Sequence, residues 1–247
     1  MSRPLSKKQI GELDKRIKAT AGSLSERDRQ EYQTYISYCA QIQNDVSAEI
    51  ASIDLCAELE TEFDWDVVGR TKTFSTIAQK LVRGDASLQT MRDIAGVRIK
   101  ADVSLGQQDR IVAVLQQRLS EGRVIDRRRD PRSGYRALHL AIRYEGIPVE
   151  IQVRTALQHV WAETYERVAD RVGRDIRYGK PVPDGNVHAQ RVVDLLQALS
   201  LNEIATIENR EERSAANPIS RLRYQRAHRR LESQVAELVQ LLDSLGY

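Results

Sequence analysis

Short β-type runs alternate with helical stretches across the middle of the chain, and this alternation restricts the possible folds more than any other feature. Five runs are typical of strands, at 67–69, 94–99, 123–125, 137–144 and 149–153. Helical periodicity fills 73–83 and 105–120, and the tight connection Glu145-Gly146-Ile147-Pro148 joins the last two strands as a hairpin. We therefore expect a mixed five-stranded sheet flanked by helices, in the α/β or α+β class.

Helical periodicity also precedes the sheet region. Apolar residues recur at three- to four-residue spacing from residue 7 to about residue 62, and Gly22-Ser23 separates a short helix from a long one. Ser25, with Asp28 three residues later, predicts a capping box at the start of the long helix.

A third helical zone begins near Gly185, and Asn217-Pro218 divides it. The final helix carries an apolar stripe of Leu222, Leu231, Val235, Leu238, Leu242 and Leu245. We expect this stripe to pack on its own chain; the alternative is contact with a second copy or a regulator. The patterns together predict N-terminal helices at 1–62, a core at 63–180 and a C-terminal helical extension at 185–247.

Charge and hydropathy bear on the compartment. Charged residues make up 30% of the chain, and no stretch approaches the ~18 apolar residues that a membrane helix needs. The N-terminal segment has no apolar signal-peptide core, so we expect a cytoplasmic protein without a membrane partner. Cys39 and Cys56 fall in one helical pattern, too far apart for a disulfide, and we expect both thiols to be buried.

An arginine run lies between Arg118 and Arg136, where seven arginines face only three acidic residues. Such a run is usually a solvated surface. Its position directly before the most motif-like part of the chain favours an anionic ligand or RNA instead. The candidate RNA-binding residues are Arg127, Arg128, Arg129 and Arg132.

No glycine-rich phosphate loop occurs in the sequence, so phosphates would be held by side-chain cations. Arg70 and Lys72 alternate at the end of a strand and therefore point the same way. Ser75 and Lys80 follow at the start and middle of the next helix, where the N-terminal dipole favours phosphate.

Two carboxylates, Asp93 and Glu150, lie in apolar strands. An acid in such a place must be paired, exposed at the mouth of the sheet or bound to a cation. One interpretation is an ion pair with Arg98 or Arg154. The other is a Mg²⁺ ion held by both carboxylates and by phosphate oxygens, and the spacing alone leaves both open.

Five ordered motifs cover residues 64–172. They are Gly-Arg70-Thr-Lys72 with Ser75 and Lys80, Asp93-Ile-Ala-Gly-Val-Arg98, Ser133-Gly134-Tyr135-Arg136-Ala-Leu-His139-Leu, Glu150-Ile-Gln152-Val-Arg154-Thr, and His159-Val-Trp161-Ala-Glu163. In this order they resemble the RelA/SpoT synthetase domain. The resemblance implies a nucleotidyltransferase-like fold and a single-domain small alarmone synthetase or a toxic relative. Such an enzyme is a pyrophosphokinase, which moves the β,γ-pyrophosphate of ATP to a 3′-hydroxyl.

The resemblance also implies roles for individual residues. Asp93 and Glu150 would bind Mg²⁺, and Glu150 would take the proton of the attacking hydroxyl. Arg70 and Arg98 would enclose the adenine of ATP. The remaining roles go to Lys72, Ser75 and Lys80 on the ATP phosphates, to Tyr135 stacking on the acceptor base, and to Arg136, His139, Gln152, Arg154 and His159 around the acceptor. By residue type alone, His139 and Trp161 are typical of satisfied core groups, and Glu163 of a partner that orients Arg154.

The chain departs from the guanosine-specific enzymes in two places. The loop from Asp126 to Tyr135 is short and lacks their Lys-Asp-Tyr element, and the helix after Glu150 lacks their Glu-His pair. Both differences resemble the toxic branch, which modifies the 3′-CCA end of tRNA or makes adenosine alarmones. The sequence slightly favours tRNA as the acceptor over GDP or GTP, which would give (p)ppGpp. A silent nucleotide-binding module is the third alternative. An antitoxin or regulator and a homo-oligomer are partners that the sequence leaves open.

Overall fold

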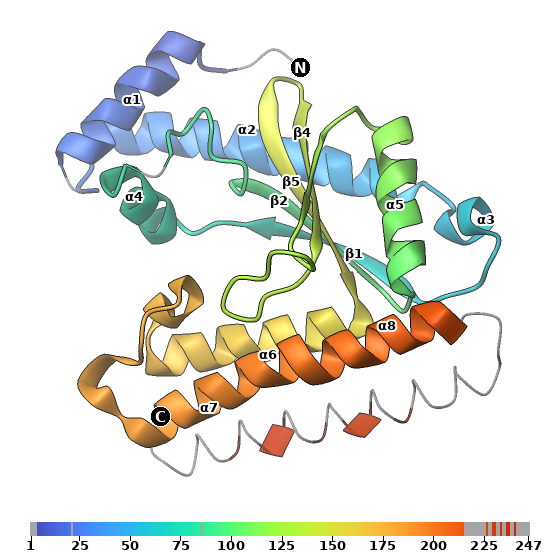
Figure 1. The fold of residues 1–247 in the computed structure, drawn as a ribbon. Coiled ribbons are helices and arrows are strands. Elements are labelled where there is room, and N and C mark those ends of the chain that lie inside the picture. Colours follow the sequence, from blue (N-terminus) through green and yellow to red (C-terminus); the bar gives the residue numbers. More distant parts are fainter. Residues whose placement is uncertain are drawn as a thin grey trace.

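The computed structural model describes residues 4–20, 22–84 and 86–214, together with seven single positions between 226 and 240. A five-stranded open sheet lies at its centre (Figure 1), in the order β1 (Trp65–Thr71), β2 (Ala95–Ala101), β5 (Ile147–Thr155), β4 (Leu138–Tyr144) and β3 (Arg123–Asp126). Strands β2 and β5 are parallel, and the other neighbours are antiparallel. The predicted mixed sheet is confirmed, and β4 and β5 form the predicted hairpin through Glu145 and Gly146, which both have positive φ.

Helices surround the sheet. They are α1 (Lys7–Ala19), α2 (Glu26–Ala51), α3 (Leu55–Leu59), α4 (Phe74–Val82), α5 (Leu105–Arg118), α6 (Ala156–Val172), α7 (Val187–Ala198) and α8 (Ala205–Ser214). A short 3₁₀ helix, η1 (Arg174–Tyr178), follows α6, and a π-helical segment, Leu199–Ile204, joins α7 to α8 without a break. In Figure 1, α6, α7 and α8 run along the opposite side of the sheet from α1 and α2.

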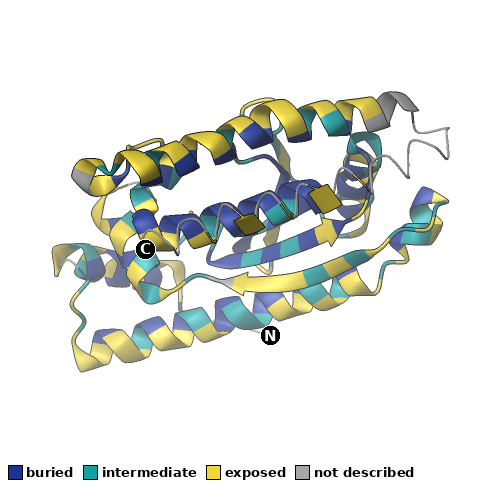
Figure 2. Ribbon diagram, turned by 90° about the horizontal axis from the view of Figure 1, so that it is seen from below, coloured by how far each residue is buried: buried dark blue, intermediate teal, exposed yellow. Residues whose placement is uncertain are grey.

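One face of the central strands is apolar because their side chains alternate. Val97, Ile99, Ile151 and Val153 are at most 1% exposed and pack in one cluster with residues of α2 and α5. Helix α1 belongs to the same cluster, so the N-terminal helices share a core with the sheet. At the edge of the sheet, β1 keeps most of its residues exposed (Figure 2).

The N-terminal helices differ from the prediction in two details. The Ser25 side chain caps α2 as predicted, but the Asp28 carboxylate accepts from the Ser25 hydroxyl and pairs with Arg16 rather than completing a capping box. The long helix also stops at Ala51, so Cys56 lies in the separate helix α3. Neither cysteine forms a disulfide, but only Cys39 is buried, and the prediction of a buried Cys56 is wrong.

The C-terminal helices form a second apolar cluster with α6. Trp161 lies inside it, 1% exposed, and its indole donates to the Leu196 carbonyl at 2.6 Å, which confirms the predicted core role. The predicted break at Asn217-Pro218 and the apolar stripe from Leu222 to Leu245 lie outside the described residues. No described helix combines the length and apolar character needed to cross a membrane.

Candidate active site

The polar face of the sheet brings the predicted residues together by strand register. Arg70 pairs with Gly96, and Gly96 in turn pairs with Glu150 on β5. One row further along, Arg98 is opposite Gln152. Gly96 permits close approach at this point, since a Cβ there would lie 2.9 Å from the Arg70 carbonyl oxygen.

A pocket opens over these rows. Its lining residues are Arg70, Lys72, Asp93, Gly96, Val97, Arg98, Glu150 and Gln152. All of them except Gly96 and Val97 are residues that the sequence predicted for the site. Arg70 and Lys72 both line it, as their alternation along the strand predicted.

Asp93 is paired with lysines rather than with Arg98 or Arg154. Lys80 donates to its Oδ2 at 2.7 Å, and Lys72 contacts the same oxygen. Burial raises the pKa of Asp93, but the two ammonium groups outweigh it and leave the pKa below its ordinary value. Burial also lowers the pKa of Lys72 to about 8, against the attraction of Asp93. Two cations thus share one carboxylate oxygen.

Glu150 is held by neutral and cationic donors. His139 Nδ1 lies 3.1 Å from its Oε1, and Gln152 Nε2 donates to its Oε2 at 3.1 Å. Burial raises the pKa of Glu150, but its contacts with His139 outweigh this and lower the pKa overall. Glu150 is therefore an ionised carboxylate at neutral pH.

A hydrogen-bonded network continues from Glu150 to Tyr135. The Tyr135 hydroxyl lies 2.9 Å from His139 Nε2, and Arg154 Nη2 reaches the same hydroxyl at 3.2 Å. The Arg154 guanidinium also lies over the Tyr135 ring, 5.1 Å from its centroid. Burial would lower the pKa of His139, but Tyr135 and Glu150 on its two sides raise it to about 9. His139 is 8% exposed and both its ring nitrogens have partners, so it is a satisfied buried histidine, as its residue type indicated, and its partners connect Glu150 with Tyr135.

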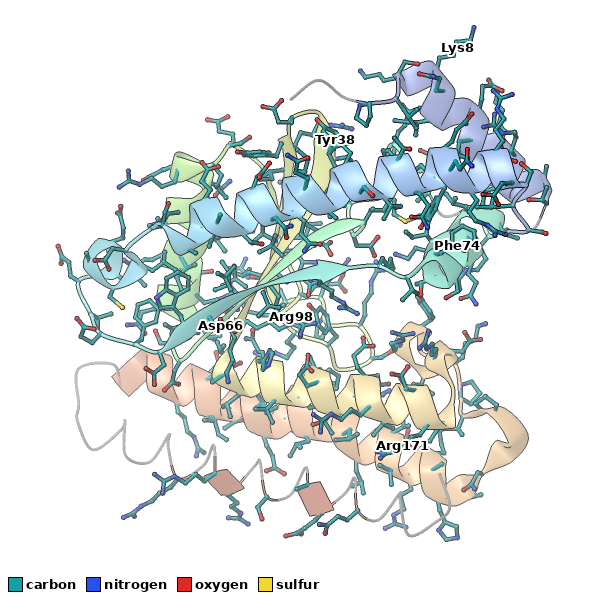
Figure 3. All side chains as sticks on the ribbon, turned by 180° about the vertical axis from the view of Figure 1, so that it is seen from behind. Lys8, Tyr38, Asp66, Phe74, Arg98 and Arg171 are labelled. Carbon is teal, nitrogen blue, oxygen red and sulfur yellow. The ribbon has the colours of Figure 1, made fainter. Side chains whose placement is uncertain are left out.

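A second pocket lies beside the first. It is lined by Val68, Gly69, Arg70, Arg98, Glu163 and Glu166, so Arg70 and Arg98 border both pockets. Figure 3 shows Arg98 between the sheet and α6, where it forms an ion pair with Glu163. Glu163 thus holds Arg98, and the expectation that it orients Arg154 is wrong.

Unpaired donors point to a polar ligand near α6. Arg154 is 2% exposed, yet within the described part of the chain its Nε and Nη1 are buried without a hydrogen-bond partner, as are Arg98 Nε and His159 Nδ1. Burial, and then the charge of Arg154, lower the pKa of His159 to about 4, so His159 is neutral at pH 7. Buried donors of this kind favour an anionic or strongly accepting group.

Several predicted residues lie elsewhere. Ser75 lines a different pocket, beside Phe74 and Lys180. Arg136 forms a buried ion pair with Glu208 of α8, at 2.6 Å. Glu208 was not foreseen, because nothing in its local sequence marks it.

The arginine run has two kinds of member. Arg128 is half-buried and bonds to Asp126, Asp109 and Gln108, so its guanidinium is occupied within the chain. The assignment of Arg128 to RNA is therefore wrong. Arg129 is 88% exposed and Arg132 is also exposed, whereas Arg127 pairs with Asp130.

The carboxylates suit a magnesium ion. No described group of three or more His, Cys, Asp or Glu side chains would hold a metal by itself. Mg²⁺, however, usually takes only one or two carboxylates, with water and phosphate oxygens completing its shell. Asp93 and Glu150 line one pocket, and the charge of Asp93 raises the pKa of Glu150, so the two carboxylates border the space in which such a cation would lie.

Comparison with known proteins agrees with this arrangement. Residues 69–169 match a family model described as the region found in RelA / SpoT proteins. An uncharacterized protein of Mycobacterium tuberculosis is 40% identical over 136 residues, covering 51% of this chain and 50% of that protein. The GTP pyrophosphokinase YwaC of Bacillus subtilis is 32% identical over 124 residues, covering 43% of this chain and 59% of that protein. The chain thus spans about half the length of the mycobacterial relatives it matches.

Solved structures show the same fold. The small alarmone synthetase 1 of B. subtilis has a TM-score of 0.57 at 24% identity, covering 75% of this chain and 95% of that one. The small alarmone synthetase 2 of B. subtilis has a TM-score of 0.55 at 20% identity, covering 73% and 95%. The predicted α+β class and five-stranded open sheet are confirmed by this agreement.

Proposed function

Because this chain contains a RelA/SpoT-type synthetase domain, we propose that it is an ATP-dependent pyrophosphokinase that transfers a pyrophosphate group to a 3′-hydroxyl. The observation that carries the proposal is one pocket in which the carboxylates Asp93 and Glu150 lie beside the cations Arg70, Lys72 and Arg98. Phosphoryl-type transfer depends mainly on positioning and charge stabilisation, which such a pocket supplies.

The two pockets that share Arg70 and Arg98 suggest how ATP lies. In this proposal the adenine stacks between the two guanidinium groups, and the phosphates extend toward Lys72 and Lys80. Both lysines contact Asp93 in the structure. Triphosphate oxygens would compete with Asp93 for these ammonium groups and free the carboxylate. Ser75, at the first turn of α4, lines a different pocket and stays a weaker candidate for phosphate contact.

Asp93 and Glu150 would hold Mg²⁺, which would neutralise charge on the phosphate oxygens. Glu150 would also accept the proton of the attacking hydroxyl. The 3′-oxygen forms a bond to the β-phosphorus of ATP, the bond between that phosphorus and the bridging α,β-oxygen breaks, and AMP leaves. The contacts from His139 and Gln152 keep Glu150 ionised and aimed into the pocket.

The acceptor would bind over the network around Tyr135. Arg154 and His159 carry buried unpaired nitrogens that suit an acceptor's phosphate or base, and Gln152 lines the pocket beside Glu150. Arg129 and Arg132 are exposed, and Arg132 pairs with Tyr135 in a β-bridge, which supports the 3′ end of tRNA as the acceptor. The relative named as a GTP pyrophosphokinase supports GDP or GTP, with (p)ppGpp as the product. We favour tRNA slightly.

The test is transfer of label from γ-³²P-ATP in the presence of Mg²⁺, with deacylated tRNA, GDP, GTP and AMP offered separately. Label in tRNA alone would establish an RNA-directed enzyme. Label in guanosine nucleotides would establish an alarmone synthetase. ATP labelled at the α-phosphate should leave its label in AMP in either case. ATP binding without transfer to any acceptor would contradict the proposal and favour a silent nucleotide-binding module.

A further inference from the structure

The turn that carries Tyr135 has a strained backbone. Ser133 and Gly134 both have positive φ, 49° and 82°, which few residues other than glycine adopt. The turn is closed by the Tyr135 amide, which donates to the Arg132 carbonyl at 2.8 Å. A non-glycine residue in this region persists only where its surroundings hold it there.

The C-terminal helices contact the turn on one side of Tyr135. Ser200 donates its hydroxyl to the Gly134 carbonyl at 2.6 Å, and Ser200 is 2% exposed. Gly134 also packs on Trp161, since a Cβ at this position would lie 2.7 Å from the Trp161 ring. Ser200 belongs to the π-helical segment between α7 and α8. Such segments are often found at functional sites.

A second contact, an ion pair with α8, lies on the other side of Tyr135. Arg136 and Glu208 form an ion pair at 2.6 Å, with side chains 5% and 2% exposed. Glu208 also accepts from Thr155 Oγ1 at 2.6 Å and from Gln158 Nε2 at 3.0 Å. Burial raises the pKa of Glu208 above its ordinary value, and the contacts with Arg136, Thr155 and Gln158 offset only part of that rise.

Glu208 is also connected to the Tyr135 side chain through the end of β5. Thr155 directly follows Arg154, whose Nη2 donates to the Tyr135 hydroxyl at 3.2 Å. The segment from α7 to α8 therefore contacts Gly134 before Tyr135 and Arg136 after it. It also contacts Thr155, next to the arginine that bonds the Tyr135 hydroxyl.

We propose that Ser200 and Glu208 form a clamp that positions Tyr135 for the acceptor, and that the C-terminal helices are thereby part of the acceptor site. This inference rests on the proposed function for the identity of the acceptor. Ser200 and Glu208 are positioning residues, because they act through Gly134 and Arg136. The donor residues Lys72 and Asp93 lie directly after β1 and shortly before β2, and they pair with each other. The clamp should therefore leave ATP binding unaffected.

The test uses Ser200→Ala and Glu208→Gln in the full chain, each beside a matched control. Ser52→Ala removes a comparable hydroxyl-to-carbonyl bond, 2.7 Å long, at the exposed end of α2. Glu58→Gln removes an exposed ion pair with Arg118. The readouts are acceptor KM and kcat, ATP affinity measured by calorimetry, and hydrogen exchange of the amides at 132–137.

We expect Ser200→Ala to raise acceptor KM about five- to tenfold, as loss of one buried hydrogen bond implies, with ATP affinity changed by less than about twofold. Exchange of the Tyr135 amide should become faster, and both controls should behave as the wild-type chain does. Equal losses in ATP affinity and acceptor KM would mean general destabilisation and would overturn the clamp. So would unchanged exchange and unchanged KM in Ser200→Ala.

Glu208→Gln removes a buried charge, and its folding is checked by circular dichroism. If it fails to fold, Ser200→Ala alone decides the proposal. If the wild-type chain transfers pyrophosphate to no acceptor, the proposed function fails, while hydrogen exchange at 132–137 still tests whether Ser200 holds the turn.

Discussion

The two ends of the candidate site are built from different interactions. At the donor end, Lys72, Lys80 and Asp93 meet through ion pairs, and their side chains are 19%, 24% and 27% exposed. At the acceptor end, Arg154 and His139 are 2% and 8% exposed and belong to one chain of hydrogen bonds. Charge pairs near solvent exchange partners readily, whereas a buried hydrogen-bonded network resists rearrangement.

This difference suggests how the two substrates are handled. The donor end can reorganise, because incoming phosphates offer its lysines a substitute for Asp93. The acceptor end is already organised around Glu150, so a bound hydroxyl would meet a carboxylate that is ionised and oriented. Variants at the two ends should therefore fail in different ways.

The largest effect is expected at the junction of the two ends. Glu150→Gln keeps the size of the side chain but removes the proton acceptor, so turnover should fall about 10³-fold, within the range of general-base catalysis. ATP affinity should change little by comparison. Single-turnover transfer of ³²P measures the first quantity and calorimetry the second, with exposed Glu145→Gln in the hairpin turn as the control. Turnover within a few-fold of wild type would exclude Glu150 as the base.

At the donor end we expect a smaller loss of turnover, together with tighter rather than weaker ATP binding in the absence of metal. Asp93→Asn should lower turnover about 10²-fold, because one of two carboxylates for Mg²⁺ is lost. In EDTA, however, its ATP affinity should rise, since Lys72 and Lys80 lose the carboxylate that neutralises them. Calorimetry with and without Mg²⁺ measures this, and Asp102→Asn is an exposed control. Weaker ATP binding in EDTA would show that the lysines do not contact the phosphates.

Much of the fold was predictable because its signals are local. Strand periodicity and the Glu145-Gly146 connection act over a few residues, and they correctly predicted the sheet and its hairpin. The end of α2 at Ala51 was not predicted, because the apolar periodicity continues through residues 52–55 and only tertiary packing shows that the helix stops.

The site residues divide in the same way, into those with a local sequence signal and those without one. Arg70, Lys72, Asp93 and Glu150 were predicted from short motifs, and the register of neighbouring strands brings them together. Glu208 and Ser200 were missed, because their partners lie 53 and 66 residues away and no local pattern marks them. Arg128 was misassigned for the opposite reason, since a run of charge does not show which member turns inward to Asp109.

The arginine run offers a stability test that separates its two kinds of member. Arg128→Gln breaks a pair whose arginine side chain is 9% exposed, although Asp109 is 58% exposed. We expect a loss of about 2 kcal/mol in the free energy of unfolding, below the range for fully buried pairs. This corresponds to a fall of about 4–8 °C in Tm. Arg129→Gln should leave Tm unchanged, and thermal unfolding followed by circular dichroism measures both. Equal Tm values would mean that Arg128 is not a structural residue.

The smallest expected effect is a shift in pH dependence caused by His139. Contacts with His139 lower the pKa of Glu150 despite its burial, so transfer by the wild-type chain should decline only as pH falls below the ordinary glutamate range. His139→Gln removes the lowering contact, and the acidic limb of turnover should move to higher pH. Exposed His188→Gln is the control, and turnover measured across pH 4 to 7 at saturating ATP checks the direction.

The same histidine should give stability the opposite dependence. The pKa of His139 is raised to about 9 by Tyr135 and Glu150, against the effect of burial. Its contribution to stability is therefore complete below the unfolded value of about 6.5 and is lost as pH rises toward about 9. The Tm of the wild-type chain should therefore fall over this pH interval by more than the Tm of His139→Gln. If Tm depended on pH in the same way for both chains, His139 would not bind a proton more tightly in the folded state. The acceptor end would then not be organised by a protonated His139 at neutral pH.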